Sequence, residues 1–254
     1  MVTFMIGLIK RLAVIVFLIQ CVEVSAQEKR SSYFISGDFF QIKEEENLGI
    51  VFKGPQLTFG LIYEIPIHNN LLVYRNRIGL GVSFSRGMIA AQFNFKPVDL
   101  FYGFDFSSNE TKLFVGPTLK LEYNVQLFPH LKGGQPYWFT NGHLGVGSSV
   151  ECSFDNHLVK IFFSSSLIGI ISRPQPERDP YWMNFYFSDI IAQAHEDLKF
   201  ASLADFNNSV LQLEYFPYSE DYSFSIMYSL EYYGTFKQPI VSCLNQSINF
   251  KFSL

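Results

Sequence analysis

A histidine and two serines in the segment "TNGHLGVGSSVE" are the side chains that nucleophilic catalysis needs. A serine nucleophile requires a base within hydrogen-bonding distance, and His143 could serve Ser148 or Ser149 in that role. His143 and Ser149 share one face of an extended strand, but six residues at about 3.3 Å each place them roughly 20 Å apart. Catalysis would need cross-strand neighbours, so we favour a protein that is not an enzyme, with an enzyme as the alternative.

A second group of reactive side chains occurs at His195, Glu196 and Asp197. Consecutive residues of a helix point in different directions around its axis, so these three do not converge on one ion. We interpret them as a solvated charged face. The chain is therefore expected to hold no metal and no cofactor.

These three residues lie in the longest connection of the chain, residues 172–208. Three prolines at its start forbid a helix there. From Ser188 onward, apolar residues fall at helical spacing behind a plausible Ser188 or Asp189 cap, which predicts a short amphipathic helix as far as Ala201. We expect this loop to contact a protein or small-molecule partner, and its candidate binding residues are Tyr181, Trp182, His195 and Glu196.

The remainder of the chain alternates apolar and polar residues over long stretches, as in "LFVGPTLKLEYNVQLF" at residues 113–128. Such alternation is typical of β-strands with two different faces. A soluble sandwich and a transmembrane barrel both produce it. Strands of 12 or more residues, with 17% aromatic against 17% charged residues, favour the barrel, because a tilted strand needs about 9 to 11 residues to cross a bilayer.

Ten strands are predicted, with eight or twelve as alternatives. Short connections follow the second, fourth, sixth and eighth strands, as in a barrel with short periplasmic turns and longer outer loops. At Pro97 the apolar phase changes, which predicts a β-bulge. The expected strands are 32–43, 55–67, 71–85, 88–106, 113–128, 138–154, 157–171, 209–217, 222–236 and 242–254. The predicted fold class is an all-β, antiparallel, up-and-down transmembrane β-barrel with one long extracellular loop.

The first 26 residues have the pattern of a cleaved signal peptide. Lys10 and Arg11 precede a short apolar run, and Val24-Ser25-Ala26 suits cleavage before Gln27. That run is shorter than the ~20 residues of a spanning helix. We therefore expect a signal peptide over residues 1–26 and a single barrel domain over 27–254.

With its signal, its alternating strands, its aromatic enrichment and its final strand "SINFKFSL", the chain resembles bacterial outer-membrane β-barrel proteins as a class. The resemblance covers about residues 32–254. It implies a Gram-negative outer-membrane location, contact with outer-membrane lipid and insertion by the barrel-assembly machinery. Such barrels usually end on an aromatic residue, whereas this chain ends on Leu254.

The polar faces of the strands carry charges of both signs, which we expect to face the lumen. A ten-stranded barrel is close to the size that side chains can fill, so a salt-bridge network is favoured over a porin-like pore. A net charge of −4 gives no indication of nucleic-acid binding. The expected lumen charges are Glu64, Arg75, Arg77, Lys120, Glu122, Glu151, Lys160, Glu214 and Glu231.

The expected function follows from this architecture. We predict a binding, scaffold or narrow transport protein whose 172–208 loop meets an external partner. A lipid-modifying hydrolase of the phospholipase or lipid A deacylase type is the first alternative, and it would need a serine and a histidine in contact at the outer rim. A secreted soluble barrel is the second alternative, and it would turn its apolar face inward.

Overall fold

The structure, a computed structural model, consists of long antiparallel strands. It describes residues 30–44, 50–108, 111–128, 136–154, 157–173, 198–217, 223–236 and 240–254. The strands are β1 (Arg30–Glu44), β2 (Val51–Ile67), β3 (Asn70–Ser85), β4 (Met88–Asp105), β5 (Thr111–Leu127), β6 (Pro136–Phe154), β7 (His157–Ser172), β8 (Lys199–Ser202), β9 (Phe206–Phe216), β10 (Phe224–Thr235) and β11 (Val241–Ser253).

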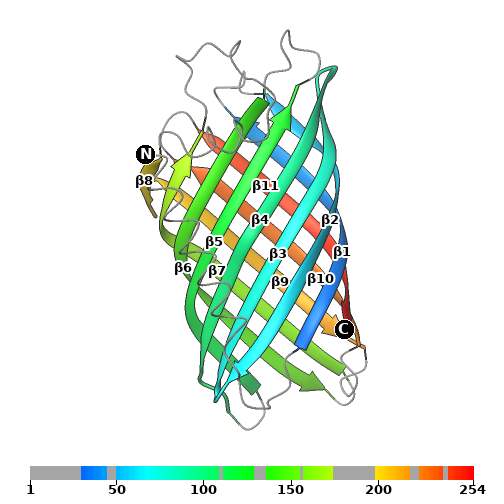
Figure 1. Ribbon diagram of the computed structural model, residues 1–254, viewed down its shortest axis with the longest axis vertical. Helices are drawn as coiled ribbons and strands as arrows, with labels where there is room; N and C mark the ends of the chain where they lie inside the picture. The colour runs from blue at the N-terminus through cyan, green and yellow to red at the C-terminus, as the bar shows by residue number, and fades with distance from the viewer. Residues whose placement is uncertain are drawn as a thin grey trace, which may run out of the picture.

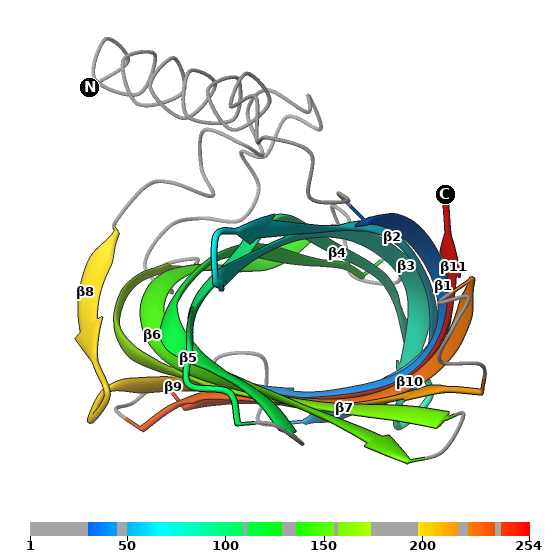
Figure 2. The ribbon, with the colours of Figure 1, turned by 90° about the horizontal axis from the view of Figure 1, so that it is seen from below.

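Ten of these strands form a closed ring (Figures 1 and 2). Each strand pairs with the next along the chain, β7 pairs with β9, and β1 pairs with β11 to close the sheet. The four-residue β8 pairs only with the end of β7, and it lies beside the ring in Figure 2. The predicted up-and-down barrel of ten strands is therefore confirmed.

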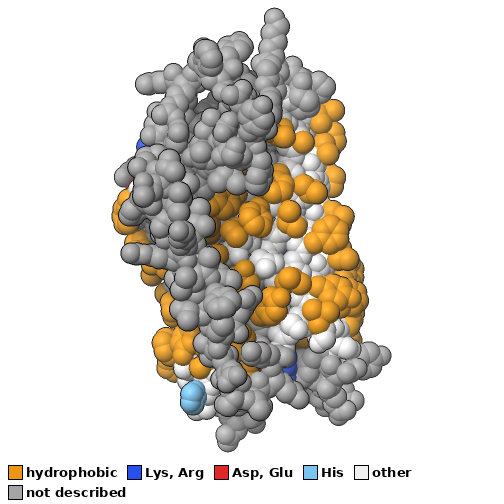
Figure 3. Space-filling model, in the orientation of Figure 1, with side chains coloured by type: hydrophobic (Ala, Val, Ile, Leu, Met, Phe, Trp, Pro, Cys, Tyr) orange, Lys and Arg blue, Asp and Glu red, His pale blue; other side chains and the backbone are white. Residues whose placement is uncertain are grey.

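The two faces of the sheet have opposite chemistry. In β5, Leu119 is 39% exposed on the outside, whereas its neighbours Thr118 and Lys120 are buried inside. Figure 3 shows apolar side chains spread over the exterior, with few charged side chains on the described part of that face. A period-two pattern in a closed sheet places one set of side chains toward lipid and the other toward the lumen. Among the described residues, no helix is long and apolar enough to cross a membrane.

Local sequence explains two features of β3 and β4. Arg86 and Gly87 both have positive φ, as a tight two-residue hairpin between these strands requires. The pairing of β4 is irregular on both sides of Pro97: its register shifts between Phe95 and Val98 against β5, and beside Arg75 and Arg77 against β3. Proline lacks the N–H that a regular ladder would use, so the predicted bulge forms at this residue.

The long connection differs from the expectation at its end. The predicted helix was to include Ala201, but Lys199–Ser202 is strand β8, so that part of the prediction is wrong. Pairing with β7 overrides the helical spacing of the apolar residues there. Leu198 is not helical either, and residues 188–197 of the predicted helix lie outside the described residues. The predicted signal peptide also lies outside them and stays a prediction.

The outward face gives a depth-dependent prediction. Leu119 is the middle residue of the 17-residue β5, whereas Leu113 is near the start of the same strand. We expect Leu119→Arg to lower the free energy of unfolding by about 2–4 kcal/mol, and Leu113→Arg by no more than about 1 kcal/mol, because a charge costs most at the bilayer midplane. Urea unfolding in lipid vesicles measures both, and equal losses would contradict the inferred membrane position.

Candidate functional site

A carboxylate from one wall of the barrel binds two cations from the opposite wall. Glu231 of β10 accepts hydrogen bonds from Lys96 of β4 and Arg77 of β3. The short β8 is not part of the ring of ten strands. Within this ring, β4 and β10 are five places apart. The side chains of Glu231 and Lys96 are each only 4% exposed. This group of ion pairs, the upper bridge, therefore crosses the lumen away from bulk water.

The upper bridge extends to Glu122 of β5. Lys96 Nζ lies 3.1 Å from Glu122 Oε2, and the same carboxylate accepts hydrogen bonds from three asparagine amides. The donors are Asn94 at 2.8 Å, Asn124 at 3.0 Å and Asn141 at 3.4 Å. A buried charge is costly unless it is paired and hydrogen-bonded, and these contacts meet that requirement.

A second group of ion pairs, the lower bridge, crosses the lumen nearer to the end of the barrel where β11 ends. Glu64 Oε1 of β2 lies 3.1 Å from Lys160 Nζ of β7 and 3.4 Å from Lys251 Nζ of β11. β2 and β7 are again five places apart in the ring. Lys160 also pairs with Glu151 at 3.2 Å, and Lys251 with Glu214 at 3.1 Å. The two bridges therefore tie opposite walls together at two places.

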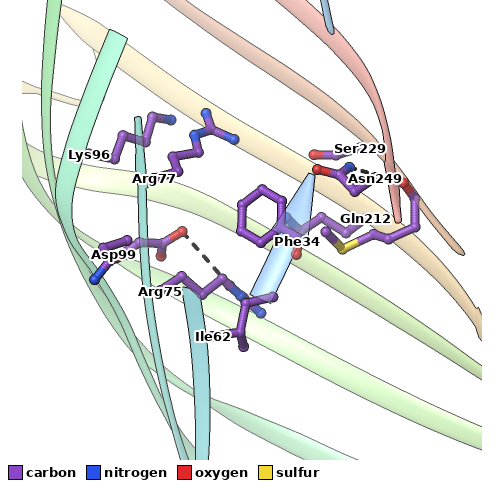
Figure 4. Close-up of a pocket in the computed structure, with 11 residues that line it drawn as sticks. Phe34, Ile62, Arg75, Arg77, Lys96, Asp99, Gln212, Ser229 and Asn249 are labelled. Carbon is purple, nitrogen blue, oxygen red and sulfur yellow. Dashed lines mark hydrogen bonds and ion pairs between the residues drawn. The ribbon is translucent and has the colours of Figure 1, made fainter. Parts of the chain in front are cut away.

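The space between the bridges is small. Arg75 lies 3.8 Å from Asp99 and stacks 4.4 Å from the centre of the Phe162 ring. Figure 4 shows Arg75, Arg77, Lys96 and Asp99 around a cavity of about 20 Å³, and a second cavity of about 10 Å³ adjoins Glu64 and Lys160. A water molecule needs about 10–15 Å³, so each cavity has room for roughly one water.

An apolar layer fills the lumen at the other end of the barrel, where β1 ends and β11 begins. Phe139 of β6 stacks on Tyr233 of β10 at 5.3 Å and contacts Phe206 of β9 at 6.0 Å. The long 172–208 segment connects strands at this end of the barrel. The layer consists of Phe40, Ile42, Phe52, Ala90, Phe128, Tyr137, Phe139, Ala201, Phe206, Tyr233, Val241 and Cys243.

The structure places the predicted lumen charges in these contacts. Eight of them take part in the two bridges or in the Arg75–Asp99 pair, and Lys120 donates to Ser164 Oγ at 2.9 Å. Sequence reasoning missed Lys96 and Asp99. Lys96 shares the parity of Gln92 and Asn94, and the bulge resets the phase so that Asp99 also turns inward, so the signal was present in β4.

The candidate catalytic residues are not brought together. His143 and Ser149 are buried on the lumen side, whereas Ser148 has the opposite parity. His143 Nδ1 lies 3.2 Å from Asn141 Oδ1, and its ring packs 5.9 Å from Phe206. Among the described residues, no serine hydrogen-bonds to His143. The contacts found thus supply no activated nucleophile.

Other expectations fall outside the described part of the chain. Tyr181, Trp182, His195 and Glu196, the candidate binding residues of the loop, lie in residues 174–197. Within the residues that the structure does describe, no group of three histidine, cysteine or acidic side chains is placed to hold a metal ion.

These features define the class of the protein. The closed ring of ten strands leaves no unpaired edge, its exterior is apolar, and the charges of the two bridges face inward. In hydrocarbon this is the arrangement that satisfies the backbone of a β-protein. The chain is an integral β-barrel of the bacterial outer membrane.

Comparison with known proteins adds only distant likenesses. No protein-family model matches the chain, and no curated protein matches it. The β domain of the Bordetella autotransporter Brka is 9% identical, with a TM-score of 0.41 over 90% of this chain and 100% of that chain. An outer-membrane channel from Pseudomonas putida F1 is 6% identical, with a TM-score of 0.41 over 92% and 98%. Neisserial surface protein A is 10% identical, with a TM-score of 0.37 over 89% and 99%.

We expect the loss in the free energy of unfolding to differ between carboxylates of the upper and lower bridges. Glu231→Gln removes the one carboxylate that forms an ion pair with Arg77 among the described residues, and it leaves Lys96 with Glu122 alone, so we expect a loss of about 3–5 kcal/mol in the free energy of unfolding. Glu151→Gln is the matched control, because Lys160 keeps Glu64 as its partner and Glu151 is 15% exposed. Denaturant unfolding of both variants in vesicles tests this, and a loss for Glu151→Gln as large as that for Glu231→Gln would contradict it.

Proposed function

We propose that the protein is a non-conducting barrel that acts as a binding or scaffold protein in the outer membrane. One observation carries the proposal: ion pairs join opposite walls at the upper and lower bridges, and the apolar layer lies beyond them. An ion entering the lumen would have to displace buried, paired side chains, each of which is costly to separate. Narrow transport would need both bridges to open.

Binding in this proposal takes place at the outer end. The barrel supplies a rigid base, and the 172–208 segment is its longest connection. Connecting segments on a rigid scaffold commonly carry binding residues. Tyr181, Trp182, His195 and Glu196 are the candidates for contact with a protein or small-molecule partner. Surrounding outer-membrane lipid and the barrel-assembly machinery are the other proposed partners.

Conductance across planar bilayers tests the closed lumen. We expect the purified wild-type barrel to give no stable single-channel steps, because charged and aromatic side chains fill the lumen. Folding of the inserted protein is verified by its shift in electrophoretic mobility on heating. Stable, repeated steps from folded wild-type protein would overturn the non-conducting proposal and favour transport.

Protease treatment of intact cells tests which end faces outward. Trypsin is expected to cut after Arg178 in the long connection and to spare Lys112, the exposed second residue of β5 at the opposite end of the barrel. Mass spectrometry of the released peptides identifies the cut. Cleavage after Lys112 without cleavage after Arg178 would reverse the orientation and remove the loop from contact with an external partner.

A further inference from the structure

A groove of about 570 Å³ lies on the outer wall of the barrel, over β1 to β4 and apart from the lumen. Its volume is within the range of about 300–1,000 Å³ typical of small-molecule sites. Most of its lining faces lipid, and Tyr33, Ile35, Phe59, Ile78 and Phe95 are each about 40% exposed. This hollow, the acyl groove, therefore opens to the hydrocarbon of the membrane.

A polar side chain lies in the acyl groove. Asn76 is the seventh residue of the 16-residue β3, and it pairs directly with the outward-facing Leu61 of β2. Paired residues on neighbouring strands share a face, so the Asn76 amide is on the lipid side near the middle of its strand. Polar groups at that depth are costly unless they are hydrogen-bonded.

The neighbouring contacts fix the orientation of this amide. Tyr74 Oη donates its proton to the Pro97 carbonyl oxygen at 2.7 Å, so it can only accept from Asn76 Nδ2, which lies 3.5 Å away. Asn76 Oδ1 is left as the free acceptor, and no described residue donates a hydrogen bond to it. The acyl groove thus combines an apolar lining with one unpartnered acceptor.

The wall is thin at this point. Phe34, Asn76 and Arg77 line both the acyl groove and the internal cavity of Figure 4. Arg77 is fixed on the inner side by Glu231, and Phe34 packs against Gly60, which has no side chain to fill the space. One residue of the groove lining, Arg77, is therefore held by the upper bridge.

We propose that the acyl groove binds a fatty acyl chain that carries a hydroxyl group part-way along its length. Acyl chains are the molecules that surround this wall, and the lining of the groove is complementary to them. A hydroxyl at mid-chain reaches the depth of Asn76 and donates to its Oδ1. An unsubstituted chain would fill the groove but leave this acceptor without a partner.

The test compares 12-hydroxystearate with stearate by calorimetric titration of the folded full-length protein in detergent micelles. We expect 12-hydroxystearate to bind about three- to tenfold more tightly, the effect of one net hydrogen bond. Asn76→Leu should bind both acids with equal affinity, because it keeps the apolar volume and removes the acceptor. Ile78→Trp should weaken binding of both acids by filling the groove.

Leu213→Trp is the matched control, because Leu213 is an equally outward residue of β9 on another part of the wall. It should leave both affinities unchanged. Equal affinities in the wild type, a preference that persists in Asn76→Leu, or equal effects of the two tryptophan variants would each overturn the proposal. The mobility shift on heating establishes that each variant is folded, and Asn76→Ala replaces Asn76→Leu if that variant is not. Failure here would leave the non-conducting function untouched, since the groove lies outside the lumen.

Discussion

The whole architecture depends on the hydrogen-bonding of the backbone in hydrocarbon. Lipid tails offer no donors or acceptors, so each peptide group of a spanning strand must find its partner within the sheet. Closure of the ring between β1 and β11 meets this requirement, with register that continues from Ser32 opposite Ser253 to Glu44 opposite Val241. Once the sheet is closed, the alternation of residues leaves no choice: one face meets lipid and the other is enclosed.

Enclosure then decides what the interior can contain. Ten strands surround a space that long side chains can span, and charged groups in that space need partners from the facing wall. Glu231 and Glu64 each meet a lysine five strands away. Such pairs contribute less to net stability than their short distances suggest, because both charges lose their hydration. Their clearer effect is to hold the two walls in one relative position.

The bulge at Pro97 links the inside and the outside of the barrel. One extra residue in β4 lets both Lys96 and Asp99 point inward, although they are three positions apart. On the lipid side the same irregularity frees the Pro97 carbonyl to accept from Tyr74, and this contact orients Asn76. A single backbone defect thus contributes to both the upper bridge and the acyl groove.

Much of this fold could be predicted from the sequence, because period-two alternation depends only on which residues face lipid. The ten barrel strands and the phase change at Pro97 were found in this way. The pairing of charges was not, since strand tilt decides that Glu231 meets Lys96, 135 positions earlier in the chain. β8 was missed because four residues are too few to show alternation. The proposed hydrogen-bonding role of Asn76 could not be predicted, because it depends on the contact of its amide with Tyr74, which the sequence does not show.

The strand pair that closes the ring also sets an order of events. β11 is synthesised after all the other strands, and until it arrives β1 has a bare edge with a row of unmatched amides and carbonyls. If the strands were inserted one at a time, the backbone groups of that edge would be unpaired in the hydrocarbon of the membrane. The polypeptide must therefore either close the barrel before it enters the membrane or pair the edge of β1 with a strand of another molecule until β11 is in place.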